Sequence, residues 1–241
     1  MFAAEITAIA RGLACAATVV ALGSCQMEPA SQTPQERGAA AIADCVATSC
    51  ATLNLDSINL PDYSALSGMT HLGAVMISYT GFDDLSVLTP LTALEEIHIG
   101  HTPVTDLSPL AGFPNLRLLH MQGVRTDDYR VLRQLTGLEE LAIGRTPIPN
   151  VVFARDMPNL KRLDISNSQV RDLSALRNHP SLEVLNIDAI PTTDLSVLLT
   201  IPNLREVTVG NPEFSPGLAD EITRLRAAGI NVTFEAVMVV C

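Results

Sequence analysis

Residues 72–93 read LGAVMISYTGFDDLSVLTPLTA, and residues 94–115 read LEEIHIGHTPVTDLSPLAGFPN. The two stretches are equally long and share one pattern of apolar and polar positions. A leucine recurs every 22 residues, and Cys50 occupies the equivalent position one period before the first of these leucines. The series is Leu72, Leu94, Leu116, Leu138, Leu160, Leu182 and Leu204. Seven full periods of the template LxxLxIxxTxVxDLSxLxxLxx cover residues 50–203, which predicts a stack of similar structural units.

Each period has two parts with different local structure. Its first part alternates apolar and polar residues, which is typical of a strand with one buried face. Its second part begins with a residue whose side chain can accept hydrogen bonds from the N–H groups of a short helical turn. That column consists of Asp62, Asp84, Asp106, Asp128, Asn150, Asp172 and Asp194. A ladder of cation-binding carboxylates is the alternative interpretation, but one repeated turn type explains the same column.

The fifth repeat departs from the template. Pro147, Pro149, Val151 and Ala154 interrupt the usual Asp-Leu-Ser-x-Leu pattern there. Because proline restricts its own backbone and that of the preceding residue, we expect a local change of turn, or a slight bend, in this repeat.

The repeats resemble the leucine-rich repeats of bacterial proteins in the 22-residue, internalin-like class, over about two-thirds of the chain. The resemblance implies an α/β solenoid. Its curved parallel sheet would have about nine short strands, with short helical or 3-10 turns on the convex side. It also implies a non-catalytic module that binds a protein partner on the concave face of the sheet.

The N-terminus has the pattern of an export signal. Arg11 precedes an apolar stretch from Gly12 to Leu22, which is too short for a membrane span. Leu22-Gly23-Ser24-Cys25 resembles the lipobox of bacterial lipoproteins, in which the cysteine is lipidated and becomes the first mature residue. We therefore predict a signal peptide at 1–24, lipidation of Cys25 and a lipid-anchored envelope protein. By the same resemblance, Gln26 after the cysteine favours the outer membrane over the inner membrane. The alternative to a lipoprotein signal is an ordinary cleaved signal peptide that happens to be followed by a cysteine.

The rest of the chain divides into a tether at 25–33, an N-terminal cap helix at 34–49, repeats at 50–215 and a C-terminal cap at 216–241. Terminal units of a repeat stack need such caps, because otherwise their apolar faces meet water. The C-terminal cap is expected to hold a helix and a last strand. The N-terminal helix is expected to face the repeats with the stripe Ala39, Ile42, Ala43 and Val46.

Composition excludes some functions. The formal net charge is −11 and the pI is about 4.8, which argues against a nucleic-acid partner. The sequence has no Gly-rich phosphate loop, GxSxG, HExxH or CxxC pair, so we predict no cofactor. In an oxidising compartment Cys45 and Cys50 could form a disulfide; alternatively, Cys50 is a small apolar filler in a leucine slot.

One block of outward-facing positions in the second to fifth repeats stands out, because it combines an aromatic residue, an exposed methionine, an exposed leucine and three histidines. Aromatic and methionine side chains are enriched at the centres of protein interfaces. We call this block the concave patch: Met76, Tyr79, Glu96, His98, His101, Leu118, His120, Gln122, Glu140 and Arg145. The later outward positions Asp164, Ser166, Asn186 and Asp188 are polar and are expected to be ordinary solvated surface.

Three functions follow from these observations. The first is protein binding through the concave patch. The second is a structural envelope component without a specific partner. The third is a metal-dependent enzyme that uses His98, His120 and Glu96, because two histidines and a glutamate can bind zinc. Mixed polar residues are common on such faces, so we favour the first function and predict no metal.

Overall fold

The computed structural model describes residues 32–211 and 216–234. The chain divides into two units, Met1–Thr33 and Pro34–Cys241, and the following description concerns the second unit. The predicted signal peptide at 1–24, Cys25 with most of the tether, and the end of the C-terminal cap at 235–241 lie outside the described residues.

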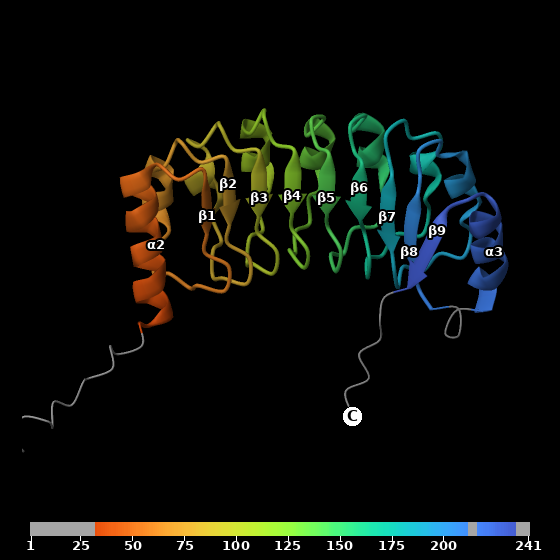
Figure 1. Cartoon of the computed structure of the whole chain (residues 1–241), viewed down its shortest axis with the longest axis horizontal. Coiled ribbons are helices and arrows are strands. Elements are labelled where there is room, and N and C mark those ends of the chain that lie inside the picture. The colour runs from red at the N-terminus through yellow and green to blue at the C-terminus, as the bar shows by residue number, and fades with distance from the viewer. Residues whose placement is uncertain (1–31, 212–215, 235–241) are drawn as a thin grey trace, which may run out of the picture. The chain divides into compact units, whose positions relative to one another are not determined.

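Nine strands form one curved parallel sheet in chain order, as Figure 1 shows. This confirms the predicted solenoid. The strands are β1 (Thr52–Asn54), β2 (Ala74–Met76), β3 (Glu96–His98), β4 (Leu118–His120), β5 (Glu140–Ala142), β6 (Arg162–Asp164), β7 (Val184–Ile187), β8 (Glu206–Val209) and β9 (Asn231–Phe234).

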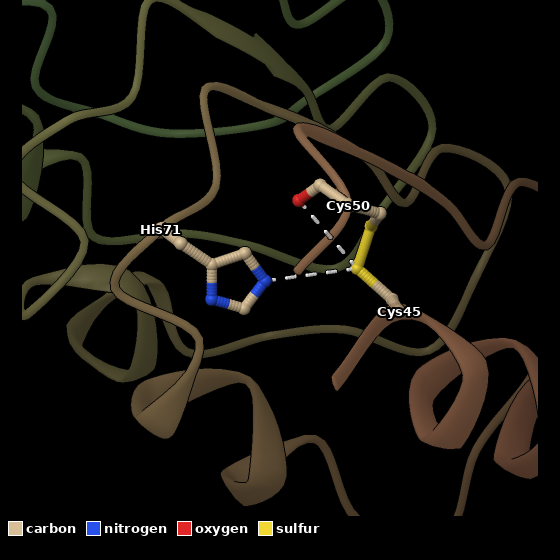
Figure 2. A group of neighbouring side chains, drawn as sticks. All are labelled: Cys45, Cys50 and His71. Carbon is tan, nitrogen blue, oxygen red and sulfur yellow. Dashed lines mark hydrogen bonds between the residues drawn. A yellow bond between two sulfur atoms is a disulfide. The ribbon is translucent and has the colours of Figure 1, made fainter. Parts of the chain in front are cut away.

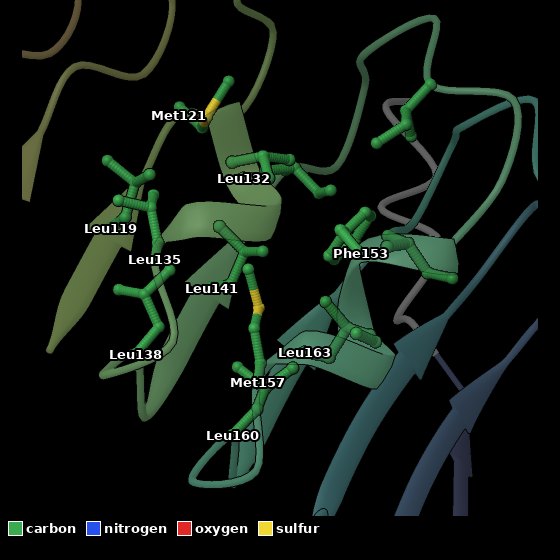
Figure 3. Close-up of a cluster of buried hydrophobic side chains, with 14 of the residues drawn as sticks. Leu119, Met121, Leu132, Leu135, Leu138, Leu141, Phe153, Met157, Leu160 and Leu163 are labelled. Carbon is green, nitrogen blue, oxygen red and sulfur yellow. The ribbon is translucent and has the colours of Figure 1, made fainter. Parts of the chain in front are cut away.

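The register of the sheet follows the period of the sequence. Val75 lies beside Ile97, and Ile97 lies beside Leu119, each one repeat further along. The side chains of these central strand residues point inward and are between 0% and 3% exposed along the first eight strands. Figure 3 shows how leucines, methionines and Phe153 from successive repeats pack into one continuous core. Each repeat therefore buries its apolar face against its neighbours.

Short 3-10 turns connect the strands on the opposite side of the core. They are η1 (Ser64–Gly68), η2 (Leu85–Leu88), η3 (Ser108–Gly112), η4 (Arg130–Gln134), η5 (Val152–Asp156), η6 (Ser174–Leu176) and η7 (Ser196–Thr200), and η8 (Pro216–Leu218) precedes the last helix. The predicted Asp/Asn column caps all seven turns between strands. In the second repeat, for example, the N–H of Ser86 donates to Oδ1 of Asp84 at 2.8 Å.

The fifth repeat keeps the same turn, so the expected change of turn is wrong. The N–H of Val152 donates to Oδ1 of Asn150 at 3.2 Å, as in the other repeats. Pro147 and Pro149 both precede the turn, where they do not interrupt its hydrogen bonds. Asn150 supplies the same acceptor as the aspartates, which is sufficient to keep this turn.

The N-terminal helix α2 (Pro34–Thr48) packs beside β1 at one end of the stack. Gly38 and Cys45 are its buried residues, and Ala41 and Ile42 are partly buried against the core. A Cβ atom on Gly38 would lie only 2.6 Å from Cδ2 of Leu60, so the helix can approach the first repeat closely only because residue 38 lacks a side chain.

The predicted stripe of α2 is therefore wrong in three of its four positions. Ile42 faces the core, but Ala39 and Ala43 are exposed and Val46 is 57% exposed. The smallest residue of the helix, Gly38, determines the packing face, which apolar character alone does not reveal.

The other end of the stack is covered by α3 (Ala219–Ala227), whose Ile222 and Leu225 are buried. The chain then turns at Gly229, with φ of +85°, and forms β9. In the last strand pair, β8 with β9, Glu206 lies beside Asn231. The step between paired residues is therefore longer here than the 22 residues of the other repeats. The insertion of a helix in place of a turn accounts for the longer step. No helix among the residues described is long and apolar enough to cross a bilayer.

Candidate functional site

The concave patch lies on the exposed face of β2–β5 and on the residues that follow these strands. Side chains alternate along each strand, so the residues on either side of a buried central residue face outward. The register places the strand members in two neighbouring columns, with Glu96, Leu118 and Glu140 in one, and Met76, His98 and His120 in the other. Structural periodicity alone therefore brings these six residues together.

Two imidazole–carboxylate pairs form the centre of the patch. Nε2 of His98 lies 2.6 Å from Oε1 of Glu96, two residues earlier on the same strand. Nε2 of His120 lies 2.8 Å from Oε1 of Glu140 on the neighbouring strand. The two imidazole rings lie side by side, with centroids 4.4 Å apart. Each imidazole thus uses one nitrogen on a carboxylate, and the four side chains form one polar surface.

This arrangement does not support a zinc site at His98, His120 and Glu96. A metal site needs at least three ligand atoms that converge on one point. Within the part of the chain that the structure describes, the group of three or more such atoms within 4.8 Å of one another is Cys45, Cys50 and His71, at the N-terminal cap. The two histidines are neighbours, as expected, but they pair with different carboxylates: Nε2 of His98 with Glu96 and Nε2 of His120 with Glu140, so the three ligand atoms do not gather at one point.

An aromatic stack borders the patch where the strands end. The ring of Tyr79 is stacked on the imidazole of His101, with centroids 4.6 Å apart and an interplanar angle of 16°. Tyr79 is 61% exposed, which makes it the most exposed large apolar residue among those described. A large aromatic side chain that is held in place and yet solvent-exposed is typical of an interface residue.

The backbone at these positions is left-handed. Tyr79 has φ of +58° and His101 has φ of +55°. The same conformation recurs every 22 residues, at Ser57, Tyr79, His101, Gly123, Arg145, Asn167 and Ala189. In each of the first six, the N–H donates to a carbonyl of the next repeat, as Tyr79 does to Gly100 at 2.8 Å. The stack thus imposes an uncommon conformation that aims these side chains away from the core.

Leu118 is less exposed than the sequence suggests. It is half-buried in a shallow groove of about 240 Å³, whose other lining residues are Glu95, Glu96, Arg117, Glu139 and Glu140. Met76 is likewise half-buried. These two side chains therefore offer apolar surface between charged groups rather than protruding from the sheet.

Gln122 and Arg145 lie towards the far side of the patch. The carbonyl of Gln122 accepts the N–H of His101 at 2.7 Å, and its side chain is half-buried. Arg145 is exposed, and Gly123 separates it from His101 in the left-handed column. The structure thus brings Tyr79 and His101 into contact but leaves Arg145 two repeats away from His101.

A ladder of charges, which was not predicted from the sequence, runs along the start of the strands. Glu95, Arg117, Glu139, Lys161, Glu183 and Arg205 occupy one column with alternating sign. Arg117 Nε lies 2.8 Å from one oxygen of Glu139, and Lys161 Nζ lies 2.6 Å from the other. Hydrogen bonds from Lys161 and Arg117 lower the pKa of Glu139. The 22-residue spacing of opposite charges was the signal that could have revealed this ladder.

The later repeats use their outward polar residues locally. Oδ1 of Asp164 accepts the N–H of Ser166 at 2.9 Å, and Oδ1 of Asn186 accepts the N–H of Asp188 at 3.0 Å. Ser166 is only 6% exposed, so its expected place on the solvated surface is wrong. Asp164 and Asn186 therefore support the backbone, while Asp164, Asn186 and Asp188 remain half-buried at the surface.

Comparison with known proteins supports the fold. No protein-family model matches the sequence, and no curated protein matches it. Among solved structures, internalin C2 (inlC2) from Listeria monocytogenes is 22% identical with a TM-score of 0.68, and the match covers 83% of this chain and 93% of that one.

Two further structures match less completely. An internalin (inlF) from Listeria monocytogenes is 21% identical with a TM-score of 0.61, over 77% of this chain and 53% of that one. A leucine-rich-repeat protein from Leptospira interrogans is 17% identical with a TM-score of 0.56, over 76% and 54%. This chain therefore spans about half the length of these two proteins. At such identities the likeness establishes the leucine-rich-repeat fold.

Proposed function

We propose that this protein is a non-catalytic, protein-binding leucine-rich-repeat protein whose concave patch contacts the partner. The observation that carries the proposal is the stack of Tyr79 on His101, which holds a 61% exposed aromatic ring at the border of the patch. Buried aromatic anchors dominate the energetics of protein interfaces. The surrounding Met76 and Leu118 add apolar area, and the His–Glu pairs add polar contacts.

We further propose that the protein is exported and held in the bacterial envelope by a lipid on Cys25. This rests on the resemblance of residues 22–25 to a lipobox and on the preceding apolar segment. Gln26 favours the outer membrane. A Cys25→Ala variant should be released in soluble form or remain as an uncleaved precursor; unchanged membrane fractionation together with an unchanged mass would refute the anchor.

The location of the binding face can be tested by photocrosslinking in the native cell. A photoreactive amino acid at position 79 should give a discrete crosslinked product with one protein. The same residue at position 186, on the polar later part of the sheet, serves as the matched control. Diffuse or absent crosslinking at both positions would favour the alternative function, a structural component without a specific partner.

Substitutions then measure the contribution of the patch. Tyr79→Ala combined with Leu118→Ala should abolish partner capture and leave the fold intact, because Tyr79 is exposed, Leu118 is only half-buried and neither belongs to the buried core. The control pair is Asp164→Ala with Asn186→Ala. A larger loss of binding in the control pair would place the binding face on the later repeats.

A further inference from the structure

Outside the concave patch, Cys45, Cys50 and His71 form a compact group at the junction of the N-terminal cap and the first repeats (Figure 2). Cys45 comes from the last turn of α2, Cys50 lies two residues before β1, and His71 lies in the loop before β2. In the structure the two cysteines form a disulfide. Nε2 of His71 lies 4.0 Å from Sγ of Cys45.

His71 occupies a position that has another role in later repeats. The equivalent residue Asn115 donates from its side chain to the carbonyl of Thr92 at 3.2 Å, and Asn203 donates to the carbonyl of Pro180 at 2.6 Å. These side chains tie one repeat to the one before it. His71 is the last residue of the first repeat, which has the cap helix α2 and no other repeat before it. Its imidazole points at the cysteine pair instead.

We propose that Cys45, Cys50 and His71 are a transition-metal site, with Zn²⁺ as its probe ion, that exists only when the disulfide is reduced. Two thiolates and one imidazole are the ligand types that zinc prefers, and three protein ligands leave a fourth position for water or another ligand. The three ligand atoms already lie within 4.8 Å of one another. Around tetrahedral zinc, such atoms are separated by roughly 3.5–3.8 Å.

The backbone holds the two cysteines together independently of the sulfur–sulfur bond. The N–H of Cys50 donates to the carbonyl of Cys45 at 3.1 Å, and their Cα atoms are 4.8 Å apart. Reduction therefore leaves both thiols near His71, and rotation about the Cα–Cβ bonds is enough to separate the sulfurs to metal-binding distance.

The site is open to a reductant and to an ion. Cys45 is 3% exposed, but Cys50 is half-buried and His71 is exposed. Thiol–disulfide exchange with a dithiol reductant would break the Cys45–Cys50 bond, yielding two protein thiols and one oxidised reductant. Zn²⁺ would then replace the two thiol protons. The disulfide and the metal are thus mutually exclusive ways of fastening α2 to the repeats.

The test is a zinc titration of the full chain, in its disulfide form and after reduction under anaerobic conditions, against a chromophoric chelator. We expect one equivalent of zinc to bind the reduced protein and none to bind the disulfide form. His71→Ala should weaken zinc binding by about tenfold or more, since loss of even an outer partner of a ligand has an effect of that size. Cobalt should give the intense absorption of a thiolate complex in the reduced wild type only.

Matched controls separate the site from the other cysteines and histidines. Cys241→Ser and His101→Ala should leave zinc affinity unchanged, whereas Cys50→Ser should abolish the thiolate absorption of the pair. Equal affinity in reduced wild type and His71→Ala would overturn the proposal. So would the absence of stoichiometric binding, or loss of the α2 helix on reduction in the presence of zinc, measured by circular dichroism.

Discussion

The imidazole of His101 lies where a side chain at residue 123 would have to be, because a Cβ atom on Gly123 would come within 2.6 Å of Nδ1 of His101. Gly123 itself has φ of +72° and belongs to the left-handed column that also holds Tyr79 and His101. The glycine therefore leaves the space in which His101 lies, and His101 in turn supports Tyr79.

Gly123→Ala should consequently disturb the stack. The added methyl group displaces the His101 ring and occupies a left-handed backbone conformation, which together should lower stability by about 1–2 kcal/mol. The ring signals of His101 in NMR spectra should also lose the shift caused by Tyr79. Gly68→Ala is the matched control, because a Cβ atom there meets nothing within 4 Å. Unchanged His101 signals in Gly123→Ala would show that residue 123 does not position the ring.

The aspartate caps predict the acid limit of stability. Hydrogen bonds from the side chain and N–H of Ser86 lower the pKa of Asp84 below its ordinary value of 3.8. Hydrogen bonds from the serine two residues later have the same effect on the pKa of Asp62, Asp172 and Asp194. A hydrogen bond from the Arg130 side chain is the main cause that lowers the pKa of Asp128 to about 2.

A carboxyl group whose pKa is lower in the folded state contributes stability above its unfolded pKa and loses it as the pH falls through the folded pKa. The melting temperature should therefore fall between about pH 4 and about pH 2. Asp84→Asn keeps the acceptor oxygen without the titration, so its melting temperature should fall less over this window. Asp84→Ala removes the cap and should be less stable at pH 7 as well. Identical pH profiles in all three proteins would contradict this account.

His179 predicts a second pH effect, close to neutrality. It is 4% exposed and occupies the core position that Met157 and Ile201 fill in neighbouring repeats. Its Nδ1 accepts the N–H of Leu182 at 3.2 Å, and Nε2 lies 3.2 Å from the carbonyl of Ala154. Burial lowers the pKa of His179 below its ordinary value of 6.5.

A histidine whose pKa is lower in the folded state destabilises the fold once the pH drops below its pKa in the unfolded chain. In that range the unfolded chain takes up the proton and the folded chain does not. Stability should therefore decline as the pH falls below about 6.5. His179→Met should show a smaller difference in melting temperature between pH 7.5 and pH 5.5. His101→Gln, a change on the sheet face, should retain most of that difference; equal differences in both variants would rule out His179 as its cause.

The cap helix offers a test of packing. Gly38→Val would force a branched side chain against Leu60 and Ile58, at positions where even a Cβ atom is 2.6–2.7 Å from them. Such overpacking should lower stability by about 1–3 kcal/mol. Ala39→Val, on the exposed side of the same helix, should change stability by less than about 0.5 kcal/mol. Denaturant unfolding of both variants makes the comparison, and equal effects would mean that α2 does not pack through Gly38.

The recurrent leucines and aspartates were enough to predict the solenoid, the strand register and the capped turns, because each of these features repeats and any one copy reinforces the others. The cap helix does not repeat, and its packing face depends on where a glycine can approach Leu60, which apolar patterning does not reveal. The fifth turn was mispredicted because Pro147 and Pro149 lie before the turn, where they leave its hydrogen bonds intact. The stacking of Tyr79 on His101 required the left-handed backbone and the space above Gly123, neither of which a strand pattern contains.

The ladder of alternating charges constrains how such a protein can change in length. Excising one repeat, from Arg117 to Leu138, would place Glu95 beside Glu139, and duplicating one repeat would likewise set like charges side by side. Removing or duplicating two consecutive repeats keeps each carboxylate next to a cation. The charges therefore repeat with a period of two repeats, whereas the leucines repeat with a period of one. A change of length that preserves the ion pairs must add or remove two repeats at a time.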